Sequence, residues 1–136
     1  MTMTAVPEGF TPHARKSPVT DAWEPLFSRR TDDALQLGLR VAEAHTNSRG
    51  FAHGGLISAL ADNAMGLSCG LGIAKAGGLV TVNLALDFLA IARIGQWLQV
   101  EPTVVKRGKN LCFASALVTA DGVPCARANA TFQIVQ

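Results

Sequence analysis

Apolar and polar residues alternate along two separate stretches of this chain. In residues 34–44 every second position is apolar, at Leu35, Leu37, Leu39 and Val41. In residues 80–88 one face would carry Val80, Val82, Leu84, Leu86 and Phe88, and the other Thr81, Asn83, Ala85 and Asp87. A period of two over such lengths predicts β-strands with one buried face.

Three more strands are expected in the C-terminal half, at about 97–106, 111–120 and 123–135. Arg107-Gly108 and Asp121-Gly122 separate them, and the second pair is a two-residue hairpin signal. Because the connections are short, the four strands from residue 80 onward should form an antiparallel meander.

A single long helix is predicted between the first two strands. Residues 55–74 are rich in Ala, Leu and Met and lack Pro, which favours a helix roughly 30 Å long. Its apolar residues surround it on most sides, so one flat sheet could not cover it. The sequence therefore predicts an α+β fold in which a curved antiparallel sheet wraps the helix and a second copy of the chain covers the remainder.

The first 20 residues show no sustained period and contain Pro7, Pro12 and Pro18, so we expect an irregular N-terminal arm on the surface. Residues 21–136 are then one domain, since a chain of 136 residues has no room for a second. No apolar segment follows a basic start, which excludes a signal peptide. Asp62 and Asn63 interrupt the most apolar stretch, 54–76, and argue against a membrane span.

The composition narrows the possible partners. Hydrophobic residues make up 49% and charged residues only 16%, so little polar surface is available and self-association is expected. The net charge of +2 is too small and scattered for a nucleic-acid surface. Cys69, Cys112 and Cys125 lie in apolar stretches without metal-ligand spacing, so we expect buried free thiols in a cytoplasmic protein and no metal site.

Asp62 is the conspicuous residue of the helix. A carboxylate in mid-helix is usually solvated on a polar face, but no Lys or Arg lies three, four or seven residues away and no polar face is available here. Partial desolvation would raise the pKa of such a carboxyl group and make it a candidate base or nucleophile.

The run His53-Gly54-Gly55 precedes the helix. Free amide groups at a helix N-terminus carry partial positive charge, and glycine lets a substrate oxygen approach them, as in an oxyanion hole. The alternative is that the glycines form a tight loop and His53 caps the helix. His13 and His45 have no reactive neighbours in the sequence and are expected to be structural.

Gly54 and Asp62 are too far apart to act on one carbonyl group within one chain. Eight helical residues span roughly 12 Å, whereas reacting groups must come within about 3 Å. If both are catalytic, they come from two subunits whose helices pack antiparallel across a two-fold axis.

The runs HTNSRGFAHGGLISALADNAMG, LVTVNLALDFLA and VVKRGKNLCFASALVTADGVPCARANATFQIV resemble the hotdog-fold acyl-CoA thioesterases, specifically the phenylacetate-pathway (PaaI-like) group of the 4HBT superfamily. The resemblance covers the chain from about residue 34 to its end. It implies a hydrolase that cleaves an aryl or aliphatic acyl-CoA without a cofactor, as a homodimer with shared active sites that pairs into a tetramer.

The resemblance also implies roles for individual residues. Asp62 matches the general base or nucleophile, and Gly54 the amide that holds the thioester oxygen. Asn47 and His53 match residues that position the thioester, and Thr81 matches a hydroxyl that orients the attacking water.

Other residues are candidates for binding the substrate. Arg107, Lys109 and Arg49 could contact the CoA phosphates, although a solvated basic turn is an equal reading of the first two. The acyl group would enter an apolar cleft lined by helix residues such as Met65 and Ser58 and by the strand that carries Asn83. The alternatives to a thioesterase are a hotdog hydratase or dehydratase that acts on acyl thioesters, and a non-catalytic acyl-CoA-binding protein.

Overall fold

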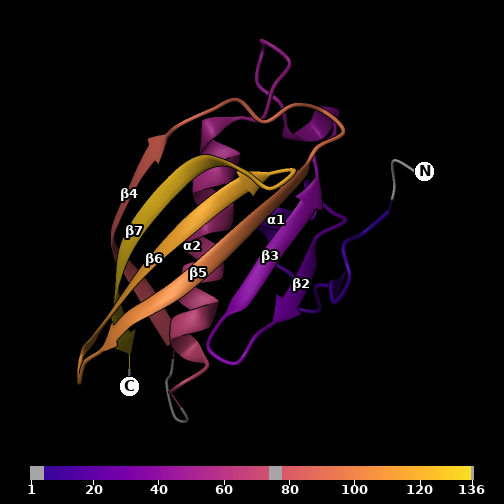
Figure 1. Ribbon diagram of the computed structural model, residues 1–136. Helices are drawn as coiled ribbons and strands as arrows, with labels where there is room; N and C mark the ends of the chain where they lie inside the picture. Colours follow the sequence, from indigo (N-terminus) through magenta and orange to yellow (C-terminus); the bar gives the residue numbers. More distant parts are fainter. Residues whose placement is uncertain (1–4, 74–77, 136) are drawn as a thin grey trace.

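One antiparallel sheet curves around one long helix in this protein (Figure 1). The computed structural model describes residues 5–73 and 78–135. Seven strands follow the order β1-β2-β3-β5-β6-β7-β4 across the sheet. Their bounds are β1 Thr11–Pro12, β2 Phe27–Arg30, β3 Leu35–Arg40, β4 Gly78–Phe88, β5 Trp97–Arg107, β6 Leu111–Ala120 and β7 Val123–Val135; the helices are α1 Pro18–Asp21, a 3₁₀ turn Glu43–His45 and α2 Gly54–Gly70. The predicted α+β architecture is confirmed.

Helix α2 is shorter than predicted at its C-terminal end. It ends at Gly70, so the predicted end at residue 74 is wrong, although residue 74 itself lies outside the described residues. The cause is a cap from another element, because the Arg107 guanidinium donates to the carbonyls of Ser68 and Cys69. Those carbonyls belong to the last turn, where Ser68 O otherwise accepts only a 3.3 Å bond from the Leu71 N–H and Cys69 O has no backbone donor among the described residues.

The sheet buries only one face of α2. Leu60, Ala61, Ala64, Met65 and Cys69 are at most 1% exposed. The opposite face, which carries Asp62, is only partly buried in one chain. The helix is therefore not wrapped nearly all round within a single subunit.

Strand β4 lies at an edge of the sheet instead of beside β5. It pairs with β7, and β5 pairs with β3 and β6, so the predicted four-strand meander is wrong for β4. The connection from β4 to β5 crosses the end of the sheet, and hydrogen bonds from Ala52 N–H to Ala92 O and from Val41 N–H to Gln96 O hold it there. The predicted hairpin between β6 and β7 is present, with Asp121 and Gly122 both at positive φ.

A β-bulge reverses the faces of β4. Its register with β7 shifts between Thr81 and Asn83. After the bulge Leu84 and Leu86 pack on the core as predicted, but Val80 before it and Val82 within it are 53% and 58% exposed. Bulges redirect side chains in this way, because the extra residue changes the alternation by one position.

The described part of the N-terminal segment, residues 5–26, is structured, although the sequence predicted only an irregular arm over residues 1–20. It contributes β1 and α1, and β2 follows as a strand that the pattern did not predict. Phe10 is buried with its ring 5.2 Å from the Trp97 ring, and Leu26 joins the main hydrophobic core. Elements of two to four residues are too short to show a period.

The last observations concern the cysteine thiols and the length of the helices. All three cysteines are buried free thiols, and burial raises the pKa of Cys69 to about 12. Within residues 5–73 and 78–135, no helix is long and apolar enough to cross a membrane.

Candidate active site

Asp62 and Thr81 form a hydrogen-bonded pair between α2 and β4. The Thr81 hydroxyl donates to Asp62 Oδ1 over 2.8 Å. The bulge in β4 turns Thr81 toward the helix, and Asp62 itself is half-buried. The ion pairs found among the described residues join Lys16 to Glu24 and Arg127 to Asp87, so neither occupies the Asp62 carboxylate.

A pocket of about 460 Å³ opens beside this pair. Glycine and apolar residues form most of its wall, and a cation from the N-terminal segment also reaches it. The lining residues are Arg15, Asp62, Asn63, Gly66, Leu67, Gly70, Leu71, Ile73, Gly78, Leu79, Thr81 and Phe132. Met65 is not among them, because it is fully buried against the sheet, and Ser58 donates its hydroxyl to Gly54 O.

The start of α2 presents a free backbone amide. His53 is the N-cap, and its Nδ1 accepts from the Gly55 N–H over 2.8 Å. The Gly54 N–H has no acceptor among the described residues. A Cβ at Gly54 would lie 3.3 Å from the Phe88 ring, so glycine leaves just enough space at this point.

Asn47 is held in the loop before the helix by its own side chain. Its Oδ1 accepts from the N–H groups of Arg49 and Phe51, over 2.9 and 3.4 Å. Because the oxygen is used in this turn, the amide NH₂ remains to donate to a ligand. Asn47 and Gly54 line one pocket of about 340 Å³, together with Phe88 and Ile57.

The predicted site residues are thus gathered into two half-sites in one chain. The acid half-site is Asp62 with Thr81, and the amide half-site is Gly54 with Asn47. His53 faces neither of these pockets and lines a third beside Trp23. The sequence offered capping as the alternative role for His53, and capping is what the structure shows.

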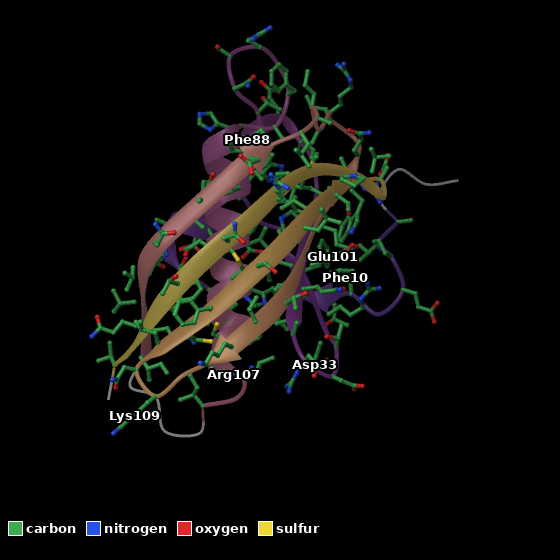
Figure 2. All side chains as sticks on the ribbon, turned by 60° about the vertical axis from the view of Figure 1, so that its left-hand side comes forward. Phe10, Asp33, Phe88, Glu101, Arg107 and Lys109 are labelled. Carbon is green, nitrogen blue, oxygen red and sulfur yellow. The ribbon has the colours of Figure 1, made fainter. Side chains whose placement is uncertain are left out.

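The three candidate CoA contacts lie in different places. Arg107 caps α2, while Lys109 is exposed in the β5–β6 turn (Figure 2). Arg49 is exposed with its guanidinium 5.5 Å from the Phe51 ring centroid. None of them lines the Asp62 pocket.

Sequence reasoning missed Arg15, the cation that does line that pocket. The N-terminal segment has no periodic pattern that would have placed this residue over α2. Only its packing, with Trp23 and Leu26 against the core, brings it there.

Chemically, the two half-sites complement each other. The Asp62 carboxylate can accept a proton from water or attack a carbonyl carbon, and the Gly54 amide can stabilise an oxygen that gains negative charge. The two half-sites lie at different turns of α2, so they do not meet within one chain.

Comparisons with known proteins point to one family. The family model described as the Thioesterase superfamily matches residues 49–126. A Pseudomonas aeruginosa protein whose name assigns it to the esterases is 41% identical over 133 residues, covering 97% of this chain and 99% of its own. Mouse acyl-coenzyme A thioesterase 13 is 34% identical over 83 residues, covering 60% of this chain and 57% of its own.

The fold agrees with the sequence match. The crystal structure of zebrafish thioesterase superfamily member 2 superposes with a TM-score of 0.78 at 25% identity, covering 87% of this chain and 88% of that one. The resemblance predicted from the sequence is therefore confirmed. The chain belongs to the thioesterase superfamily of thioester hydrolases and has the hotdog fold of its PaaI-like members.

Proposed function

We propose that this protein hydrolyses the thioester of an aryl or aliphatic acyl-CoA to the free acid and CoA. The observation that carries the proposal is the Thr81–Asp62 hydrogen bond of 2.8 Å beside a pocket of substrate size. The match to mouse acyl-coenzyme A thioesterase 13 supports acyl-CoA as the substrate class.

The chemistry requires few groups. A thiolate leaves readily, so the reaction needs a base or nucleophile and an oxyanion donor but no strong general acid. Asp62 acts as that base or nucleophile, and Thr81 orients the water. The Gly54 N–H and the Asn47 amide bind the thioester oxygen. His53 stabilises the first turn of the helix, because its Nδ1 accepts a hydrogen bond from the Gly55 N–H.

Two chains complete each site in this proposal. Strand β4 is an 11-residue edge strand whose outer side has no partner among the described residues, and proteins rarely leave such an edge open. Phe88 ends β4 (Figure 2), and Gly54 lies beside it. Asp62 accepts the hydrogen bond from Thr81 nearer the other end of the strand. Antiparallel pairing of β4 with the partner's β4 brings the amide half-site of one subunit to the acid half-site of its partner.

The dimer then carries two equivalent sites, and pairs of dimers form the tetramer that the family resemblance implies. Lys109 and Arg49 are free to contact the CoA phosphates, since both are exposed. Arg107 is the weaker candidate, because two helix carbonyls already occupy its guanidinium.

The first test replaces the carboxylate. Asp62→Asn keeps the shape and the Thr81 contact but removes the base, and it should lower kcat by roughly 10² to 10⁴-fold. Thiol release from a panel of aryl and aliphatic acyl-CoAs measures the effect. Equal turnover by the wild-type and variant proteins would refute the role of Asp62, and tight binding without turnover by the wild type would favour a binding protein.

A second test asks whether two chains share a site. Asp62→Asn and Asn47→Ala proteins, each inactive alone, are unfolded together and refolded as a mixture. Half of the dimers are then mixed, and each mixed dimer has one intact site, so activity should return to about a quarter of wild type. Sites built from one chain would regain nothing.

A further inference from the structure

A cation from the N-terminal segment faces the same pocket as Asp62. Arg15 is the one Lys or Arg among the residues that line this pocket. Its neighbour Lys16 is paired with Glu24 over 3.0 Å, whereas Arg15 has no ion pair or hydrogen bond to any residue in the described ranges. The Arg15 side chain is exposed, so its guanidinium is available to a ligand in the pocket.

The remaining wall suits an apolar chain. Leu67, Leu79 and Phe132 supply hydrophobic contact, and Gly66 and Gly70 remove side chains from the helix surface. The volume of about 460 Å³ lies within the range of small-molecule sites. A ligand that fills this space can therefore place an apolar stretch against these residues, between a carbonyl at Asp62 and an anionic group at Arg15.

We propose that Arg15 is a specificity-determining residue that binds a carboxylate at the far end of the acyl group. The substrate class is then the CoA monothioester of a dicarboxylic acid. This inference rests on the proposed function, because it takes Asp62 as the end of the pocket where the thioester reacts.

A carboxylate fits this position better than a CoA phosphate. Asp62 and Arg15 line one pocket, whereas the long pantetheine arm separates the CoA phosphates from the reacting sulfur. A carboxylate needs one cation and matches a guanidinium with two parallel hydrogen bonds.

Asp62 adds a second condition on the substrate. Its negative charge repels an anion that lies close to it. The acyl chain must therefore be long enough to hold its terminal carboxylate at Arg15 and away from Asp62. A six-carbon adipoyl group should therefore be accepted better than a three-carbon malonyl group, which would hold its carboxylate beside Asp62.

The experiment compares two thioesters of equal chain length. Adipoyl-CoA and hexanoyl-CoA differ by the terminal carboxylate, and thiol release gives kcat and KM for the wild-type, Arg15→Gln and Lys16→Gln proteins. The wild type should prefer adipoyl-CoA. Arg15→Gln should lower kcat/KM for adipoyl-CoA by about ten- to a hundredfold, mainly by raising KM, because a charge-assisted hydrogen bond to the substrate is lost. The kcat/KM for hexanoyl-CoA should stay within about twofold of the wild-type value.

Lys16→Gln is the matched control, since it removes an adjacent positive charge that lies outside the pocket. It should leave kcat/KM unchanged for both thioesters. An equal rise in KM for both thioesters would assign Arg15 to the CoA phosphates and overturn the proposal. An equal fall in kcat for both thioesters, with a shifted pH profile of kcat, would show that Arg15 acts on Asp62 and would also overturn the proposal.

The two proposals can fail separately. If the wild-type protein hydrolyses neither of these thioesters nor any member of the aryl and aliphatic acyl-CoA panel, the proposed function fails. The Kd values of adipoyl-CoA and hexanoyl-CoA for the wild-type and Arg15→Gln proteins then decide the inference. A preference for adipoyl-CoA that Arg15→Gln abolishes would uphold it, and equal Kd values would overturn it.

Discussion

Replacing Arg107 with glutamine should destabilise the protein while leaving its affinity for acyl-CoA almost unchanged. The Arg107 Nε donates to Cys69 O over 3.2 Å, and an Nη donates to Ser68 O over 2.9 Å. Both acceptors lie in the last turn of α2. The side chain of β5 therefore closes the C-terminal end of the helix that carries Asp62.

The expected loss of unfolding free energy follows from these two hydrogen bonds. A hydrogen bond to a charged group contributes about 1.5–3 kcal/mol when it is buried, and a cation at a helix C-terminus adds about 0.3–1 kcal/mol. The Arg107 side chain is partly exposed, so water replaces much of this interaction and we expect a net loss of about 1–2 kcal/mol. For a chain of this length, that loss lowers Tm by roughly 3–7 °C.

Thermal and urea unfolding at one fixed protein concentration would measure the loss, with KM for an acyl-CoA determined on the same samples. Lys109→Gln is the control for stability, since Lys109 lies on the same turn, is exposed and makes no hydrogen bond within the described part of the chain. Its KM should rise, because Lys109 is a proposed contact of the CoA phosphates. An Arg107→Gln protein as stable as the wild type but with a raised KM would refute the capping argument and restore Arg107 as a CoA contact.

Three further outcomes are expected. Thr81→Val removes the hydroxyl that donates to Asp62 and should lower kcat by roughly ten- to a hundredfold, whereas Thr81→Ser should stay close to wild type in thiol-release assays. Burial and the nearby Lys16 lower the pKa of His13 below its ordinary 6.5, so the unfolded chain binds a proton more readily; the urea midpoint should fall as the pH drops below about 6.5, and His13→Gln should flatten that fall. Gly38→Ala should cost about 1–3 kcal/mol of unfolding free energy, because its Cβ would overlap the buried indole of Trp97.

Each of these outcomes can fail in a specific way. A fully active Thr81→Val protein would show that the water is oriented by another group. An unchanged pH dependence in the His13→Gln protein would assign the acid sensitivity to other residues. A Gly38→Ala protein with wild-type Tm would show that the Trp97 ring can move, although Phe10 and Phe27 pack against it.

Two residues of the candidate site could be singled out from the sequence, because the features that mark them are local. Asp62 stands out by having no charged neighbour on its helix, and glycines at the start of that helix expose an amide. The spacing of eight residues between Gly54 and Asp62 was enough to predict that they cannot act on one carbonyl group within one chain, since the rise per residue of an α-helix is constant. The structure accordingly shows them in two different pockets.

The alternation pattern predicted most strands but not their arrangement. Residues 97–106, 111–120 and 123–135 are close to the observed β5, β6 and β7. The place of β4 beside β7 is decided by long-range pairing, and the bulge near Val82 reverses one face of that strand. A bulge changes the period by a single residue, so a sequence that still alternates cannot reveal it.

By itself the sequence determined one central helix, a set of strands joined by hairpins and a candidate carboxylate on that helix, because periodicity, hairpin residues and spacing are properties of neighbouring residues. Only the tertiary structure decided that Thr81 faces Asp62, that Arg107 caps the helix and that Arg15 reaches the pocket. The hydrogen bonds join residues 19 to 39 positions apart, and Arg15 precedes Asp62 by 47 positions. Nothing in a local pattern specifies which distant segments will pack together.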